Sequence, residues 1–160
     1  MKKILFVILS LFLFSGVFTL SAQESVNTEN TNKEIIYYED GSYIIISIFE
    51  EETLPLQART PSTKTATKHV IKYDKDDVTL WEYILEGTFS IEIGRSAVCT
   101  NASYTVDIYK DSWKFSDGDA YTLNNIGYGV GTFKKKLLGV TIQTVEIDLS
   151  ISSDIYGNIS

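Results

Sequence analysis

The chain has 160 residues, a formal net charge of −7 and one cysteine. This length is enough for one ordinary domain with a real core. The acidic balance argues against nucleic acids and anionic membranes as partners. A single cysteine, Cys99, excludes an internal disulfide, which leaves a buried thiol, an intermolecular bond or the remnant of a lost pair.

Residues 1–22 are predicted to be a secretory signal peptide. Two lysines precede an almost unbroken apolar run from Ile4 to Phe14, and small residues follow up to Ala22, which is the order of such a peptide. The alternative is an uncleaved anchor, because the apolar run could extend to Leu20 and approach the shortest membrane span. Cleavage after Ala22 would leave 138 residues with a formal charge of −9. We therefore expect a secreted or cell-surface protein without a membrane span.

Residues 23–63 are predicted to hold one local structure between two irregular segments. Residues 23–34 are polar with a single valine, a composition typical of disorder. Asp40-Gly41 then separates two β-prone runs, which predicts a β-hairpin over residues 35–49 that leans on the main domain. Residues 50–63 contain three consecutive acids and both prolines and are predicted to be a linker.

Residues 64–160 alternate β-prone runs with turn signals, and no segment there has helical spacing. In the run Val78 to Ile93, apolar and aromatic residues occupy odd positions and mostly polar ones occupy even positions, which indicates a half-buried antiparallel strand. About seven such strands predict an antiparallel β-sandwich preceded by the hairpin, with a closed β-barrel as the alternative. Trp81 is assigned to the core, where we expect it to cover the glycines at 127, 129 and 131.

Several short segments within residues 36–160 carry a resemblance to other proteins. These segments are Tyr38 to Tyr43, Thr63 to Lys68, Leu80-Trp81, Gly87 to Phe89, Cys99-Thr100, Ser112 to Lys114, and Asp154 with Gly157-Asn158. Together they resemble a group of small, uncharacterised exported β-rich proteins of Gram-positive bacteria. In that group a second cysteine precedes the terminal aspartate, and Ser153 occupies its place here. The resemblance implies that Cys99 is the orphan of a lost disulfide and a neighbour of Ser153 on adjacent strands.

No catalytic constellation is evident from the residue types. Cys99 could act as a nucleophile only if His69, the single histidine, lay beside it. Glu82 and Glu86 lie on the polar face of one strand, about 14 Å apart, which exceeds the carboxyl spacing of glycosidases. The Asp117-Gly118-Asp119 segment and the aspartates at 74, 76 and 77 offer oxygen ligands for calcium, although such residues are equally typical of turns. We expect no cofactor, with calcium as the alternative.

Exposed aromatic residues are the remaining means of recognition. Tyr37, Tyr38, Tyr43 and Trp113 are candidates for stacking on sugars or on protein surfaces, with core packing as the alternative for each. We therefore expect a non-catalytic binding or interaction module for an extracellular protein or glycan. The alternative is a carboxylate-dependent hydrolase that acts on an extracellular glycan.

Overall fold

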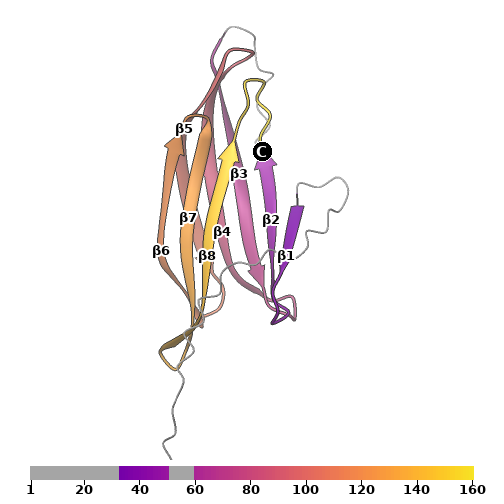
Figure 1. Cartoon of the computed structure of the whole chain (residues 1–160), viewed down its shortest axis with the longest axis vertical. Helices are drawn as coiled ribbons and strands as arrows, with labels where there is room; N and C mark the ends of the chain where they lie inside the picture. Colours follow the sequence, from indigo (N-terminus) through magenta and orange to yellow (C-terminus); the bar gives the residue numbers. More distant parts are fainter. Residues whose placement is uncertain (1–32, 51–59) are drawn as a thin grey trace, which may run out of the picture.

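The computed structural model describes residues 33–50 and 60–160, which form two antiparallel sheets packed face to face (Figure 1). The first sheet has the strand order β1-β2-β3-β4-β5 and the second has the order β6-β7-β8. The strands are β1 (Lys33–Tyr37), β2 (Tyr43–Glu50), β3 (Ser62–Tyr73), β4 (Thr79–Glu92), β5 (Ser96–Ile108), β6 (Trp113–Leu123), β7 (Ile126–Leu137) and β8 (Val140–Ser152). The sheets do not close on each other, so the predicted all-β sandwich is confirmed and the barrel alternative is wrong. Within the described ranges, no helix is long and apolar enough to span a membrane.

The hairpin of β1 and β2 is part of the larger sheet. Strand β2 pairs with β3 from Tyr43 opposite Tyr73 to Glu50 opposite Ala66, and β1 begins at Lys33, two residues before the predicted hairpin. The remaining six strands are one fewer than the roughly seven expected. Strand β6 runs through Ser116, Asp117 and Gly118, residue types that are typical of loops. A bulge between Phe115 and Asp117 absorbs that irregular sequence. The predicted signal peptide and most of the predicted leader and linker lie outside the described residues.

The core fills the space between β4 and the three-stranded sheet. The odd-numbered residues of β4 from Trp81 to Ile91 point inward and are buried, as the period-two pattern predicts. Opposite them, a Cβ atom on Gly129 would lie 2.8 Å from both Leu85 Cδ1 and Tyr83 Oη, and one on Gly131 would lie 2.9 Å from the Tyr83 ring. The glycines of β7 therefore let large side chains of β4 rest directly on its backbone.

The side chains that cover these glycines are not the ones expected. Tyr83 and Leu85 cover Gly129, and Tyr83 covers Gly131, whereas Trp81 stacks on Phe133 with ring centroids 3.9 Å apart. Trp81 is fully buried in the core as predicted. Its expected contact with the glycines is wrong because antiparallel packing places Trp81 nearer the end of β7 that carries Phe133.

Three lysines of β3 lie on the inward face of the large sheet, together with the buried residues Ala66 and Val70. Each ammonium group donates a hydrogen bond to a backbone carbonyl or a side-chain hydroxyl. Lys64 binds the Gly157 carbonyl (2.7 Å), Lys68 binds the Ser150 carbonyl (2.8 Å) and Lys72 binds Ser42 Oγ (2.8 Å). The apolar stems of the lysines fill interior space while their ammonium groups bind polar partners. The side of β3 that carries three lysines can therefore pack against the core.

Candidate functional site

Four tyrosines lie near one end of the outer face of the large sheet, and we call them the tyrosine surface. They are Tyr37, Tyr43, Tyr73 and Tyr109. The strand register places Tyr37 opposite Tyr43 and Tyr43 opposite Tyr73. Their ring centroids are 5.6 Å and 5.0 Å apart, and the second pair is stacked with an interplanar angle of 16°. Tyr37 and Tyr109 are more than half exposed, so the row offers aromatic surface to solvent.

The turns at this end of the sheet bring the tyrosines together. Tyr37 ends β1, Tyr43 begins β2 and Tyr73 ends β3, while Tyr109 directly follows β5. The backbone amide of Tyr109 donates to the Leu80 carbonyl (3.0 Å), which holds it beside β4. Antiparallel neighbours reverse direction at each turn, so residues next to turns gather at the same end of a meander.

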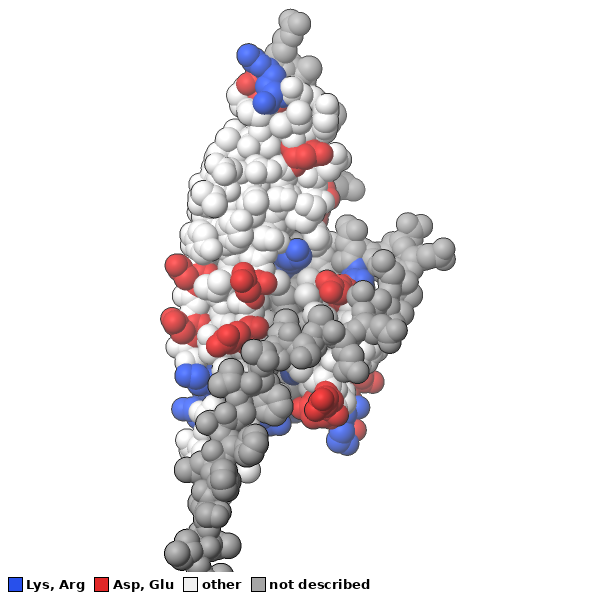
Figure 2. Space-filling model, viewed as in Figure 1, with Lys and Arg blue, Asp and Glu red and all other residues white. Residues whose placement is uncertain are grey.

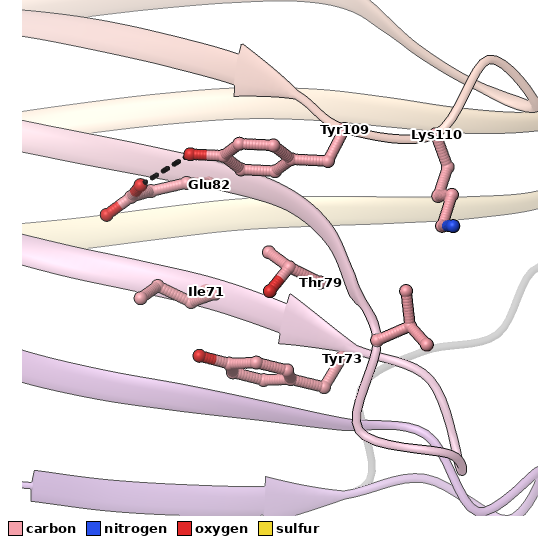
Figure 3. Close-up of a pocket in the computed structure, with 7 residues that line it drawn as sticks. Ile71, Tyr73, Thr79, Glu82, Tyr109 and Lys110 are labelled. Carbon is pink, nitrogen blue, oxygen red and sulfur yellow. Dashed lines mark hydrogen bonds between the residues drawn. The ribbon is translucent and has the colours of Figure 1, made fainter.

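A shallow hollow of about 500 Å³ separates Tyr73 from Tyr109 (Figure 3). Its other lining residues are Ile71, Val78, Thr79, Glu82 and Lys110. Figure 3 shows the two phenol rings on opposite sides of the hollow with Thr79 between them. Strands β3 and β5 flank β4, so the two tyrosines stand about 9.6 Å apart at the backbone, which is twice the strand spacing. Tyr73 and Tyr109 therefore form two aromatic walls of the hollow, with Thr79 between them and the charged residues Glu82 and Lys110 at its edge.

A chain of polar side chains fixes the Tyr109 wall. The Tyr109 hydroxyl donates to Glu82 Oε2 (3.2 Å), and Glu82 Oε1 lies 2.9 Å from His69 Nδ1. A carboxylate only accepts hydrogen bonds, so Nδ1 carries the proton in this pair. Burial and the neighbouring Glu82 carboxylate raise the pKa of Tyr109 above its usual range. The phenol therefore stays protonated and continues to donate at neutral pH.

Asp77 fixes Tyr43, another member of the tyrosine surface. The Tyr43 hydroxyl donates to Asp77 Oδ1 at 2.8 Å, and this hydrogen bond is the main reason that the pKa of Tyr43 rises to about 12. Asp77 itself has a φ of 61° in the β3–β4 turn. A turn residue in the left-handed conformation thus supplies the acceptor that orients Tyr43, which lies between Tyr37 and Tyr73.

His69 makes contacts that resemble part of a catalytic triad. Its Nε2 lies 3.2 Å from Thr67 Oγ1 while Glu82 holds Nδ1, which is the order of nucleophile, base and orienting acid. However, Thr67 sits on a flat sheet where β3 is paired on both sides, with Phe49 and with Glu86. The backbone amides of these strands are used in the ladders, so an oxyanion would find no free N–H group beside Thr67.

The structure separates His69 from Cys99. His69 lies on the outer face of the large sheet, whereas the Cys99 thiol points inward and donates to the Asn101 carbonyl (3.3 Å). Burial raises the pKa of the Cys99 thiol above its usual range, and a protonated, buried thiol is a poor nucleophile. The hypothetical dyad is therefore not assembled, and Cys99 has the contacts of a core residue.

Cys99 and Ser153 lie on two sides of one turn. The amide of Cys99 donates to the Asn124 carbonyl (2.8 Å) and the amide of Ser153 donates to the Asn125 carbonyl (3.3 Å). Both residues are buried. The expectation of adjacent strands is wrong, because Cys99 belongs to β5 of the large sheet and Ser153 follows β8 of the small one. The two positions approach each other across the sandwich, not along one sheet.

Of the four aromatic residues proposed for binding, Tyr37 and Tyr43 belong to the tyrosine surface. Trp113 does not, because it is 1 % exposed and packs edge-on against Trp81 with centroids 6.2 Å apart. Its position at the start of β6 turns the indole into the sandwich, so its proposed role in binding is wrong. Tyr38 is half-buried and its ring covers the Lys72 ammonium, which is a structural contact.

Backbone amides engage three of the candidate calcium ligands, Asp74 in the β3–β4 turn and Asp117 and Asp119 within β6. Asp74 accepts hydrogen bonds from the amides of Asp76 (2.9 Å) and Val78 (3.0 Å), while Asp117 and Asp119 each accept from the amide of the following residue. Among the described residues, no group of three or more His, Cys, Asp or Glu side chains is arranged to hold a metal ion.

Sequence reasoning missed Tyr73, Tyr109 and the hollow between them. The alternation of residues 64–73 does place Tyr73 on the same face as His69, and Tyr109 next to the turn at Lys110 is visible in the sequence. Their proximity depends on the pairing of β3 and β5 with β4, which no local pattern predicts. Comparison with protein-family models, curated proteins and solved structures gives no match.

Proposed function

We propose that this protein is a non-catalytic, secreted or cell-surface binding module that holds a glycan on the tyrosine surface. The observation that carries the proposal is the hollow between Tyr73 and Tyr109. Two aromatic walls on a rigid sheet, with polar groups at the rim, are suited to a ligand that is apolar on its faces and polar at its edge.

A pyranose ring has this character, because C–H groups cover its faces and hydroxyls surround it. Carbon atoms in van der Waals contact lie about 3.5–4.0 Å apart, so a sugar ring between two phenols needs about 7–8 Å. The backbones of β3 and β5 lie about 9.6 Å apart, and the hollow between the two side chains has a volume of about 500 Å³. Glu82 and Lys110 stand at the edge of the hollow, where they can accept from and donate to sugar hydroxyls.

The hydrogen-bonded groups around the hollow favour binding over catalysis. The two oxygens of Glu82 are already engaged by Tyr109 and His69, which leaves this carboxylate poorly placed to act as the acid or base of a hydrolase. Tyr109 is held by its hydrogen bond to Glu82, and Tyr73 by stacking on Tyr43, before a ligand arrives. Such preorganisation lowers the entropic cost of binding.

A glycan array probed with the exported protein tests this function, followed by calorimetric titration of the best polysaccharide. We expect Tyr109→Ala and Tyr73→Ala each to weaken binding by roughly tenfold or more, because each removes one stacking wall. The matched control is Tyr121→Ala, which removes an exposed tyrosine of a stacked pair on the small sheet (centroids 5.1 Å). Binding that survives both wall substitutions, or capture of an extracellular protein by this surface with no glycan bound, would contradict the proposal.

Export has a separate test. Mass spectrometry of the protein recovered from the medium or the cell surface should give an N-terminus after Ala22. A protein that retains Met1 would show that residues 1–22 remain as an anchor.

A further inference from the structure

The turn between β7 and β8 carries an exposed apolar cluster. In Figure 1 this turn extends past the ends of the other strands. Its four large aliphatic side chains, which we call the hairpin tip, are more than half exposed; they are Leu137 (60 %), Leu138 (97 %), Val140 (64 %) and Ile142 (52 %). Isolated surface aliphatics are ordinary, but a contiguous group at a protruding turn indicates an interaction site.

Leu138 occupies a backbone conformation that stability alone would not assign to leucine. Its φ is 49°, and Gly139 beside it has a φ of 83°. Asparagine, aspartate and glycine are the residues that adopt such conformations readily. The turn at the other end of β7 follows this rule, because Asn124 holds the corresponding first position with a φ of 56°. A fully exposed leucine in a strained position is thus retained for a reason other than folding.

A belt of three lysines lies directly behind the hairpin tip. Lys134 and Lys136 follow the outer face of β7, and Lys114 of β6 is directly opposite Lys134. Like charges at opposed positions destabilise a strand pair, and none of the three forms an ion pair with another described residue. The lysine belt therefore leaves three cations available next to the exposed aliphatics.

The acidic residues of the same sheet face lie farther from the tip. Asp117 and Glu146 are both opposite Thr132, and Asp119 and Asp148 are both opposite Val130. Figure 2 shows acidic side chains over the small sheet with basic side chains below them. Along β7, Thr132 is about 14 Å from Lys136 and about 20 Å from Leu138. Both distances exceed the Debye length of about 8 Å in physiological salt, whereas Lys134 is only about 7 Å from Thr132 along the strand. Asp111 also lies close to the belt, because the neighbouring Ser112 carbonyl accepts from the Lys136 amide. The lysines of β7 therefore lie between the carboxylates of this sheet face and the tip.

We propose that the hairpin tip inserts into the surface of an anionic membrane while the lysine belt binds its headgroups. Aliphatic side chains backed by lysines are the arrangement of segments that lie at the boundary between headgroups and acyl chains. Overall net charge had argued against anionic membranes as partners. Lysines lie between the carboxylates of this sheet and the tip, so the overall net charge does not describe the surface next to the tip. This site is on the small sheet and is independent of the tyrosine surface.

Vesicle flotation of the exported protein tests the proposal. The probes are phosphatidylcholine vesicles with and without roughly one-third phosphatidylglycerol. We expect binding to the anionic vesicles that falls as salt is raised from about 0.05 M to about 0.5 M. Leu138→Asn should weaken this binding roughly tenfold, because it removes the most exposed aliphatic group. The double variant Lys134→Gln and Lys136→Gln should abolish the preference for anionic over neutral vesicles.

Two controls separate insertion from loss of folding and from self-association. Leu138→Asn should unfold at the same or a higher urea concentration than the parent, since asparagine suits the positive φ. Leu123→Asn removes an aliphatic side chain that is 55 % exposed, close to Leu137 of the tip at 60 %, from the opposite end of the small sheet and should leave vesicle binding unchanged. The proposal is overturned if the parent fails to bind anionic vesicles, if Leu138→Asn binds them equally, or if sedimentation shows a dimer that Leu138→Asn dissociates without any vesicle binding.

Discussion

The ammonium nitrogen of Lys72 lies 3.3 Å from the centre of the Tyr38 ring, in a side chain with no exposed surface. It donates a hydrogen bond to Ser42, which donates in turn to Asp40. Burial lowers the pKa of Lys72 to about 8, against the opposing effect of the Asp40 carboxylate and together with the repulsion of Lys135. The chain therefore holds a buried lysine that titrates well below the usual range of lysine.

This pKa predicts a rise in the free energy of unfolding between pH 8 and pH 10. Below pH 8, Lys72 is protonated in both the folded and the unfolded chain, and the cost of burying its charge is fully present. Above pH 8 the folded chain loses the proton first, so the unfolded state binds more protons and stability increases, by at most about 1.4 kcal/mol per pH unit. Burial raises the pKa of Tyr38 to about 12, so above pH 10 its ionisation in the unfolded chain opposes this gain.

Urea denaturation of the parent and of Lys72→Met at several pH values between 7.5 and 10 measures this effect. The parent should become more stable relative to the variant as the pH rises. Methionine keeps the length of the side chain and leaves the Ser42–Asp40 hydrogen bond in place. A constant difference in stability across this range would show that Lys72 has an ordinary pKa.

The glycines of β7 are predicted to be sterically required. Gly131→Ala would place a Cβ atom 2.9 Å from the ring of Tyr83, which is held in turn by stacking on Tyr104 (centroids 5.5 Å). We expect a loss of about 3 kcal/mol in the free energy of unfolding, because a packed core cannot shift to admit the methyl group. A Cβ atom on Gly94 would meet no atom within 4 Å, but this glycine has a φ of 74°. Gly94→Ala should therefore lower the free energy of unfolding by only about 1 kcal/mol. Equal losses in the two variants would contradict close packing at β7.

Trp113 is predicted to contribute to stability and not to binding. Trp113→Ala should lower the free energy of unfolding by about 3–5 kcal/mol, as for other large core residues, whereas Tyr37→Ala should change it by less than about 1 kcal/mol. Neither buried indole N–H, of Trp81 or Trp113, has a hydrogen-bond partner within the described residues. Trp113→Phe should therefore lose much less than Trp113→Ala, since it removes an unsatisfied donor while keeping an aromatic ring. Thermal unfolding of the three variants distinguishes these outcomes.

Ser153→Cys is predicted to form a disulfide with Cys99 under oxidising conditions. The two residues contact consecutive carbonyls of the Asn124-Asn125 turn, and a bond between them would join the two sheets. We expect a gain of about 2–4 kcal/mol in the free energy of unfolding, lost on reduction. Thiol titration under denaturing conditions provides the check, with Cys99→Ala combined with Ser153→Cys as the control. Two free thiols in the oxidised variant would show that the positions are too far apart to pair.

The strands could be predicted because their signals are local. The alternation from Trp81 to Ile91 follows from burial on one side of one strand, and the Asp40-Gly41 turn needs only the positive φ of Gly41, which is 79°. The division into five and three strands could not be predicted. The turn of residues 109–112 contains polar residues, as the turns at 74–77 and 124–125 do, yet the chain leaves one sheet there and begins the next.

The site depended still more on long-range pairing. Tyr37 and Tyr43 could be foreseen as a pair across their turn, but Tyr73 joins them only through the register of β2 and β3, and Tyr109 only through β4. The burial of Lys72 could not be predicted from the sequence, for another reason. Lysine is almost never fully buried, and only the three-dimensional placement of Tyr38 and Ser42 makes an interior position acceptable for it.

The connectivity of the strands has a consequence for how the chain folds. Within each sheet, every strand pairs with the one that directly precedes it in the sequence. Each ladder can therefore grow by adding one hairpin at a time, and no strand must wait for a distant segment to be inserted between neighbours. The one long-range step is the docking of the three-stranded meander onto the five-stranded one. A topology of this kind has a low contact order for an all-β protein, which favours rapid folding.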